Sequence, residues 1–308
     1  MKRTISRILD AALVGFLLGP LGSAQTKGSQ KEPQKLKVYI SADMEGISGV
    51  VHADQTSPGT AEYAAACKWM VEDVNAAVEG ALRGGATDVV VNDSHGSMRN
   101  IDPAELHPKA VLISGSPKPL SMMQGIDDSF DAVLFVGYHA GAGTQDAILD
   151  HTISGGVVRG VRVNGVELPE LGLNAAIAGV YGVPVVFISG DVAVCRQAKT
   201  ILGSDIVTAP VKDAIGRTAA RLVPMPEARK GIKDRAADAV RHAAQMKPFR
   251  VAAPCKFELD FFVSSQADMA MLVPGVQRVN ARTVAFQSDD YLKGFRTLRG
   301  LINLVPSR

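Results

Sequence analysis

Residues 37–49 read KVYISADMEGISG, an apolar run that ends in two carboxylates and two glycines. Its first six residues, Lys37–Ala42, predict a buried β-strand. Four later runs have the same character, at residues 88–92, 110–114, 132–138 and 183–189. Ala-rich sequence with helical spacing separates several of these runs, and such alternation is typical of a parallel sheet with crossover helices. We therefore predict an α/β fold of the Rossmann-like, three-layer kind.

Two helices and one hairpin are predicted between these strands. Residues 63–82 place apolar side chains at helical spacing and are followed by Gly84-Gly85, a common way for helices to end. Residues 172–180 predict a second helix. Residues 153–168 alternate around Asn164-Gly165, which indicates a β-hairpin standing off the sheet.

The pattern changes after Gly203. Strand-rich stretches are predicted at residues 206–209, 249–262 and 276–287, and helices at 226–245, 266–272 and 291–304. This order favours a small α+β layer over another turn of the parallel sheet. We therefore expect an α/β domain over residues 37–203 and a smaller α+β domain over residues 204–308.

The first 24 residues have the features of a secretory signal peptide. Basic residues precede an apolar stretch over 11–21, and Gly22-Ser23-Ala24 is a small-residue ending suited to cleavage. That stretch is shorter than the roughly 20 residues of a membrane-spanning helix. We expect export to the periplasm or medium, with no membrane anchor after cleavage and a polar linker over residues 25–36. If the segment is instead an uncleaved amphipathic helix, the protein is cytoplasmic.

Charge and composition exclude several function classes. The 308 residues include 33 Lys+Arg and 31 Asp+Glu, a net charge of +2. Residues 1–24 hold three basic residues and one acidic residue, so the remainder is formally neutral. Aromatic residues make up only 5% and are not interleaved with basic ones, so nucleic-acid binding has no support. No phosphate-binding loop, dinucleotide fingerprint or G-x-S-x-G elbow is present.

The three cysteines, Cys67, Cys195 and Cys255, show no metal-binding spacing. Export would permit one disulfide, but an odd count leaves at least one free thiol. We expect all three to be small apolar core residues.

Titratable residues follow four of the five predicted strands of the parallel sheet. Parallel strands bring their carboxyl ends to one edge, where such sheets bind ligands. Asp43 and Glu45 are two residues apart, so in extended chain both carboxylates point the same way and need a cation between them. His95 and His139 follow two other strands and supply neutral imidazoles. Carboxylate with imidazole ligation favours Zn, Mn or Fe over calcium.

Four stretches of the chain resemble the DppA-type D-aminopeptidases, the zinc-dependent D-aminopeptidase family of bacteria. They occur in the family's order, and the resemblance extends from about residue 37 to residue 304. The four stretches are residues 41–49 (SADMEGISG), 91–95 (VNDSH), 137–140 (GYHA) and 170–175 (ELGLNA).

This resemblance implies two zinc ions per subunit. Asp43 would bridge both ions, and Glu45, His95, His139 and Glu170 would complete the ligand set. Glu170 enters through the resemblance alone, because a Glu in the first turn of a helix is ordinarily a cap. His151 matches the family's catalytic histidine, as proton donor to the leaving amine or oxyanion partner. Residues 37–203 would then be the catalytic domain, and residues 204–308 would contribute to the substrate pocket and to a ring-like homo-oligomer.

The function implied is hydrolysis of the N-terminal peptide bond of short peptides by metal-activated water, with D-amino acids of the D-Ala type. The signal peptide departs from the family's best-known members, which act in the cytoplasm, and this leaves the substrate open. Two alternatives remain. Two His with three carboxylates would also serve a dinuclear phosphoesterase, and an exported binding protein could keep the fold without the chemistry.

Overall fold

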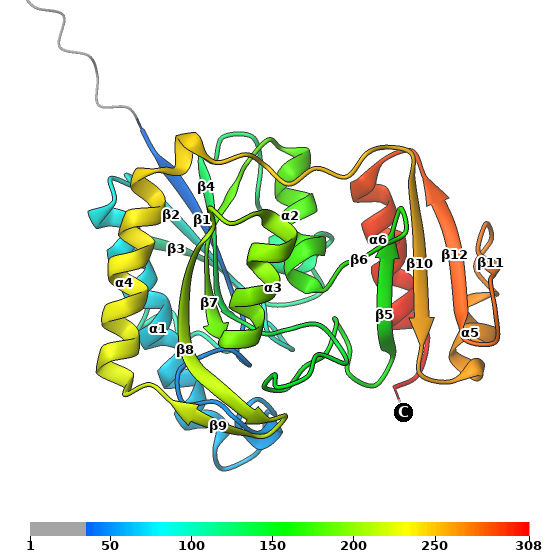
Figure 1. Cartoon of the computed structure of the whole chain (residues 1–308), viewed down its shortest axis with the longest axis horizontal. Coiled ribbons are helices and arrows are strands. Elements are labelled where there is room, and N and C mark those ends of the chain that lie inside the picture. The colour runs from blue at the N-terminus through cyan, green and yellow to red at the C-terminus, as the bar shows by residue number, and fades with distance from the viewer. Residues whose placement is uncertain (1–34, 308) are drawn as a thin grey trace, which may run out of the picture. The chain divides into compact units, whose positions relative to one another are not determined.

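A computed structural model describes residues 35–307 of the chain (Figure 1). The predicted signal peptide at 1–24 and all but the last two residues of the predicted linker lie outside the described residues. The first strand begins at Lys37, where folded structure was expected to start.

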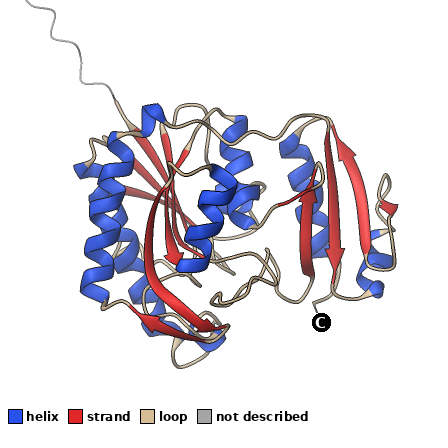
Figure 2. Ribbon diagram, in the orientation of Figure 1, coloured by secondary structure: helices blue, strands red, loops and turns tan. Residues whose placement is uncertain are grey.

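A seven-stranded sheet forms the larger part of the fold (Figure 2). Its order is β3-β2-β1-β4-β7-β8-β9, and every pair is parallel except β8 with β9. The predicted α/β architecture is therefore confirmed. The strands are β1 (Lys37–Ala42), β2 (Asp88–Asp93), β3 (Ala110–Ile113), β4 (Ala132–Tyr138), β7 (Val185–Asp191), β8 (Val207–Gly216) and β9 (Ala219–Leu222).

Helices cover both faces of this sheet. Successive side chains of a strand point to opposite faces, so its apolar residues form a core on each side. Val38 and Ile40 of β1 belong to the core beneath α1 (Tyr63–Arg83) and α4 (Met225–Arg241). Tyr39, between them, belongs to the opposite core, which includes α2 (Glu170–Val180) and α3 (Val192–Leu202). Three short 3-10 helices lie in the connections, at η1 (Ala53–Gln55), η2 (Ser121–Met123) and η3 (Ala243–Gln245).

A second, antiparallel sheet has the order β11-β12-β10-β5-β6. Its β5–β6 hairpin is the one predicted, with Asn164 and Gly165 both at positive φ in the turn. Helix α6 (Tyr291–Leu304) packs against β10, β12 and α2, and the Tyr291 hydroxyl donates to the Leu173 carbonyl over 2.9 Å. The other elements are β5 (Val158–Val163), β6 (Val166–Glu167), β10 (Cys255–Phe261), α5 (Ser264–Ala270), β11 (Gln277–Arg278) and β12 (Thr283–Ser288).

The two sheets do not divide the chain at residues 203/204, where we expected the α/β part to end. β8, β9 and α4 extend the first sheet, whereas β5 and β6 belong to the second. The reason is α3, a crossover helix that we did not predict, which returns the chain so that β8 lies parallel to β7. The change of sequence pattern after Gly203 therefore corresponds to one more parallel strand of the first sheet, β8.

None of the described helices is long and apolar enough to cross a membrane. All three cysteines are free thiols. Cys195 and Cys255 are buried as predicted, and Cys67 is half-buried.

Candidate metal centre

Two glycines let the loop after β1 lie directly against the end of β4. The Gly46 N–H donates to the Gly137 carbonyl over 2.8 Å. A Cβ on Gly46 would lie 2.0 Å from the Tyr138 oxygen, and one on Gly137 would lie 2.2 Å from the Asp43 oxygen. Gly137 also has φ +70°, which favours glycine. This close approach places the carboxylates that follow β1 beside the histidine that follows β4.

Asp43 and Glu45 face the same cluster, but not through an extended chain as we expected. The backbone turns immediately after Asp43, and the Asp43 Oδ1 atom accepts from the N–H of Met44 over 2.9 Å. Both side chains are buried. The turn, together with the glycine contact, brings the two carboxylates onto one side.

His95 follows β2 and contacts both of these carboxylates. Its Nδ1 lies 3.0 Å from Glu45 Oε2 and 3.3 Å from Asp43 Oδ1. Its Nε2 lies 2.8 Å from the Thr56 carbonyl, which can only accept a hydrogen bond. The ring therefore carries its proton on Nε2 when neutral, and Nδ1 faces the carboxylates.

His139 and His151 stack on each other at the other side of Asp43. Their ring centroids are 3.9 Å apart with an interplanar angle of 11°. The Nδ1 atom of His139 lies 3.0 Å from the Ala140 carbonyl, and that of His151 lies 2.9 Å from the Leu149 carbonyl. In both rings Nε2 is therefore the atom turned toward the carboxylates.

Glu170 begins α2 and meets both stacked histidines. Its Oε1 lies 3.3 Å from His139 Nε2 and 3.6 Å from His151 Nε2, and it accepts from the Ile153 N–H over 2.5 Å. Glu170 was expected at the site only through the family resemblance. The structure thus brings together all six residues singled out in the sequence.

The electrostatics of the cluster call for positive charge between the carboxylates. Burial and then the negative charge of Glu45 raise the pKa of Asp43 to about 7. Burial would raise the pKa of Glu170, but the charge and close contact of His139, the charge of His151 and the Ile153 N–H together outweigh burial and lower the pKa to about 2. Burial likewise opposes protonation of His139, yet the charges of Glu170 and Asp43 raise its pKa to about 10.

The donor atoms fit a metal ion. The buried His139 Nε2 forms no hydrogen bond among the described residues, although it lies 3.3 Å from Glu170 Oε1 and 3.4 Å from Asp43 Oδ2. A neutral imidazole would turn a lone pair toward a carboxylate there, which is unfavourable without a cation. Two overlapping groups place one ligand atom per residue within 4.8 Å of one another: His139 with His151 and Glu170, and Asp43 with Glu45 and His139. Imidazole with carboxylate is a donor set that zinc binds.

Two other carboxylates at strand ends accept hydrogen bonds from backbone N–H groups and do not belong to the cluster. Asp93 accepts from the backbone N–H groups of Asn100 and Ile101 and so fixes the loop that carries His95. Asp191 caps α3 through the Val194 N–H and also accepts from the Ile148 N–H. Both are structural residues, as strand-end aspartates commonly are.

Lys212 supports the loop that carries Glu45, and we did not predict this role from the sequence. It is buried in β8, and its Nζ donates to the carbonyls of Glu45, Ile47 and Val50, which lie in the loop that carries Glu45. Burial lowers its pKa to about 7, while the charge of Asp191 opposes the shift. No local pattern marks this lysine, since its acceptors lie more than 160 residues away in the sequence.

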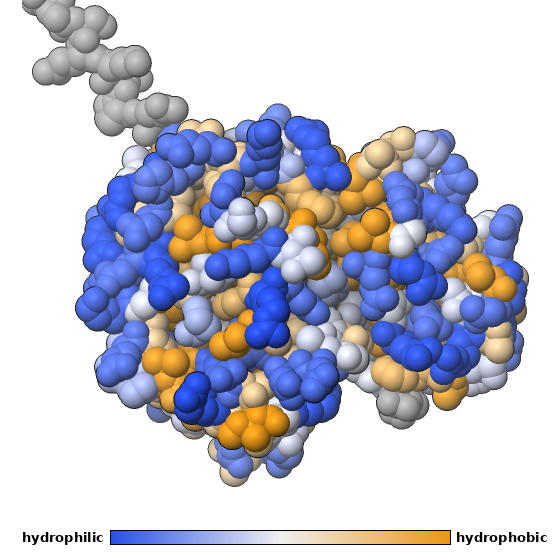
Figure 3. Space-filling model, in the orientation of Figure 1, coloured by the Kyte–Doolittle hydropathy of each residue, from blue (hydrophilic) through white to orange (hydrophobic). Residues whose placement is uncertain are grey.

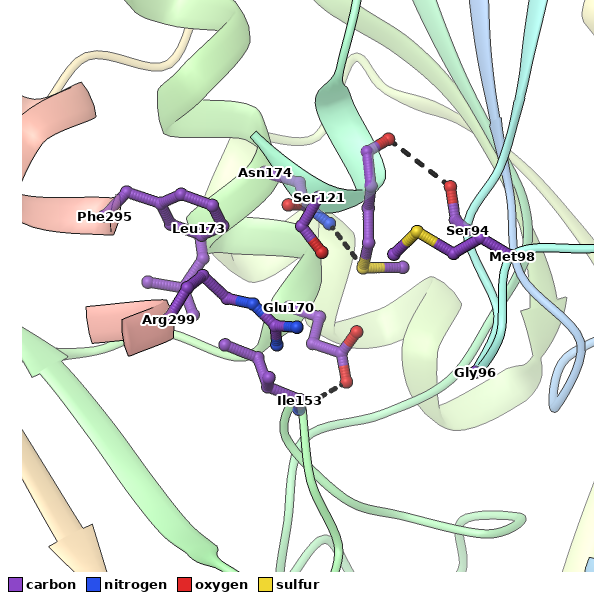
Figure 4. A pocket seen from close by; sticks show the side chains of 11 residues that line it. Ser94, Gly96, Met98, Ser121, Ile153, Glu170, Leu173, Asn174, Phe295 and Arg299 are labelled. Atoms are coloured by element: carbon purple, nitrogen blue, oxygen red, sulfur yellow. Dashed lines mark hydrogen bonds between the residues drawn. The ribbon is translucent and has the colours of Figure 1, made fainter. Parts of the chain in front are cut away.

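A small cavity adjoins Glu170 (Figure 4). It has a volume of about 80 Å³. Its walls come from the loop that follows β2 and from the helices η2, α2 and α6. Its polar lining includes Ser94, Ser121 and Asn174, and Arg299 reaches it from α6.

Three comparisons with known proteins each match this chain to D-aminopeptidases. A family model described as D-aminopeptidase matches residues 36–300. A curated D-aminopeptidase of Bacillus subtilis (strain 168) is 36% identical over 271 residues, which is 88% of this chain and 98% of the relative. The solved structure of the Zn-dependent D-aminopeptidase DppA from Bacillus subtilis, described as a self-compartmentalizing protease, superposes with a TM-score of 0.85 at 35% identity. That match covers 87% of this chain and 97% of that one. The chain therefore belongs to the D-aminopeptidase family of peptidases.

Proposed function

We propose that this protein is a dinuclear zinc aminopeptidase that releases the N-terminal residue of short peptides containing D-amino acids of the D-Ala type. The observation that carries the proposal is the cluster of six residues, in which each histidine turns one ring nitrogen toward buried carboxylates. Family membership supports the same reaction class, and a relative of known structure is described as zinc-dependent.

Asp43 is the residue best placed to be shared between two ions. Its Oδ1 faces His95, which also contacts Glu45, and its Oδ2 faces His139, which also contacts Glu170. One ion would be held by Asp43, Glu45 and His95, and the other by Asp43, His139 and Glu170. When bound, zinc supplies a Lewis acid that makes water acidic enough to attack a peptide carbonyl near neutral pH.

We assign proton transfer to His151. The Leu149 carbonyl fixes its Nδ1, so Nε2 is the atom available to give a proton to the leaving amine. Stacking on His139 and the contact with Glu170 hold the ring in place. Because His151 is more exposed than His139, it can face a substrate.

The proposal is tested by measuring zinc content together with hydrolysis of a peptide panel. Matched D-Ala-D-Ala and L-Ala-L-Ala dipeptides and a generic phosphate monoester are offered to the full chain after zinc-replete purification. We expect two zinc ions per chain, release of amino-terminal D-Ala and no phosphate release. Phosphate release without peptide hydrolysis would favour the phosphoesterase, and binding of peptide with less than one zinc per chain would favour the binding protein.

We also propose that the protein is exported and assembles into a ring-like homo-oligomer. The sequence of residues 1–24 supports export, and the description of the DppA structure as self-compartmentalizing supports assembly. The face in Figure 3 is mostly hydrophilic with separate apolar patches, and Val166, Ile215 and Leu272 are among the exposed apolar residues. A new N-terminus near residue 25 and a mass well above one 32.4 kDa chain in light scattering are the expected results.

A further inference from the structure

The cavity beside Glu170 contains a guanidinium with no hydrogen-bonding partner in the described part of the chain. Arg299 extends from α6 toward the side of the cavity where Glu170 and Ile153 stand (Figure 4). Among residues 35–307, no group forms a hydrogen bond or an ion pair with it. Arg278 differs in this respect, since its guanidinium is bonded to Asp268 and to backbone carbonyls.

Burying a charged group costs free energy unless it is paired, so a partly buried guanidinium without a partner indicates a place where a bound anion would pair with it. Burial lowers the pKa of Arg299, and the charge of Glu170 opposes this shift. A planar guanidinium offers five N–H donors in a fork that matches a carboxylate. Glu170 does not fill that fork, because its contacts are with His139, His151 and the Ile153 N–H.

The size and lining of the cavity limit what can bind. Its volume of about 80 Å³ lies well below the roughly 300–1,000 Å³ of pockets for drug-sized ligands. Apart from Arg299, its walls combine hydroxyls and an amide, at Ser94, Ser121 and Asn174, with apolar groups that include Leu173 and Phe295, and the Glu170 carboxylate lies on one side. Such a site suits a compact residue that ends in a negative charge.

We propose that Arg299 binds the C-terminal carboxylate of a short peptide substrate and so makes the enzyme selective for peptides that end one small residue beyond the cleaved bond. This inference rests on the proposed function, because it places the cleaved bond at the Glu170 side of the cavity. Arg299 is then a specificity-determining residue contributed by the C-terminal helix.

The first test uses the full-length, zinc-loaded wild-type protein and three peptides. D-Ala-D-Ala has a free C-terminal carboxylate, D-Ala-D-Ala amide has none, and D-Ala-D-Glu α-amide has only a side-chain carboxylate. We expect kcat/KM for the free acid to exceed that for both amides by at least about 10-fold. Equal rates for the free acid and its amide would overturn the inference, as would a Glu amide cleaved as well as the free acid. If none of the peptides is cleaved, the proposed function fails as well.

The second test compares Arg299→Met with Arg296→Met, which makes the same change at an exposed position three residues earlier on α6. We expect Arg299→Met to lower kcat/KM for the free acid by roughly 10- to 100-fold and to leave the amide within about 3-fold. Arg299→Lys should recover part of the loss, and Arg296→Met should match the wild type. An equal loss on both substrates in an Arg299→Met protein with unchanged zinc content would overturn the inference.

Discussion

The three histidines of the cluster share one arrangement. In each ring, one nitrogen lies within 3.0 Å of a backbone carbonyl, and the other is turned toward carboxylate oxygens. A carbonyl partner of this kind fixes the tautomer and the ring orientation, which is how protein groups behind a metal site orient its ligands. The backbone of residues 56, 140 and 149 thus decides where a cation can bind.

Replacing His151 with Gln separates proton transfer from metal binding. We expect kcat to fall by roughly 100- to 10,000-fold, because the amide cannot move a proton at the position of Nε2. Zinc content should stay at the wild-type value, since the two proposed ligand sets do not include His151. His242→Gln, at an exposed position, is the matched control. A loss of zinc in the His151 variant would show that this residue is a ligand instead.

At the scale of elements, the meeting of β1 and β4 creates the site. Gly137 is the residue that permits it, because any Cβ there would collide with the Asp43 backbone oxygen. Gly143 offers a comparison, since it also has positive φ, at +79°, but a Cβ added there would meet nothing within 4 Å.

We therefore expect Gly137→Ala to destabilise the fold by about 3 kcal/mol or more and to reduce zinc content. Gly143→Ala should cost only about 1 kcal/mol, the strain of a left-handed alanine, and should retain zinc. Denaturant unfolding and metal analysis of both variants measure these effects. Equal losses of stability would mean that backbone conformation, and not the close approach to Asp43, sets the requirement at Gly137.

The loop after β1 also depends on β8 through Lys212. Lys212→Met keeps the length of the side chain but leaves the carbonyls of Glu45, Ile47 and Val50 without their donor. Loss of roughly 3 kcal/mol of unfolding free energy is expected, with weaker zinc binding. Lys199→Met, on the exposed side of α3, should change stability by less than about 0.5 kcal/mol. Wild-type stability in Lys212→Met would refute a supporting role.

Local patterns predicted most elements but not their assembly. Strands β1, β2 and β4 and helix α6 lie within one or two residues of the predicted ranges, because each has a continuous apolar run or a clear helical period. Helix α3 was missed, since its exposed side chains at Arg196 and Lys199 interrupt the apolar pattern. Without it, the place of β8 in the first sheet could not be foreseen.

At the scale of the whole molecule, segments distant in sequence contribute to one site. The candidate ligands come from the first sheet and α2, while Arg299 comes from α6, which packs on the second sheet. Four of the ligands could be predicted from the ends of the strands, since their place at one sheet edge depends only on the order of elements. Arg299 and Lys212 could not be predicted in this way, because their roles depend on tertiary packing that no local spacing encodes.

Removal of metal should affect the stability of the whole fold. Three buried carboxylates lie within contact of the same histidines, so chelation leaves their charges without the cation that we propose. We expect a chelator to lower Tm by roughly 5–15 °C and to abolish hydrolysis. Zinc should restore both, and calcium should restore neither. An unchanged Tm after complete removal of zinc would contradict a buried metal centre.

The central claim is that Asp43 organises a zinc centre that hydrolyses peptides. Zinc content and D-Ala-D-Ala hydrolysis, measured together on wild-type protein, Asp43→Ala and the exposed control Asp128→Ala, test it most directly. We predict two zinc ions per chain and full activity in the wild type and the control. In Asp43→Ala we predict less than one zinc ion per chain and a rate at least about 1,000-fold lower. Full activity in the folded Asp43→Ala protein would contradict the account.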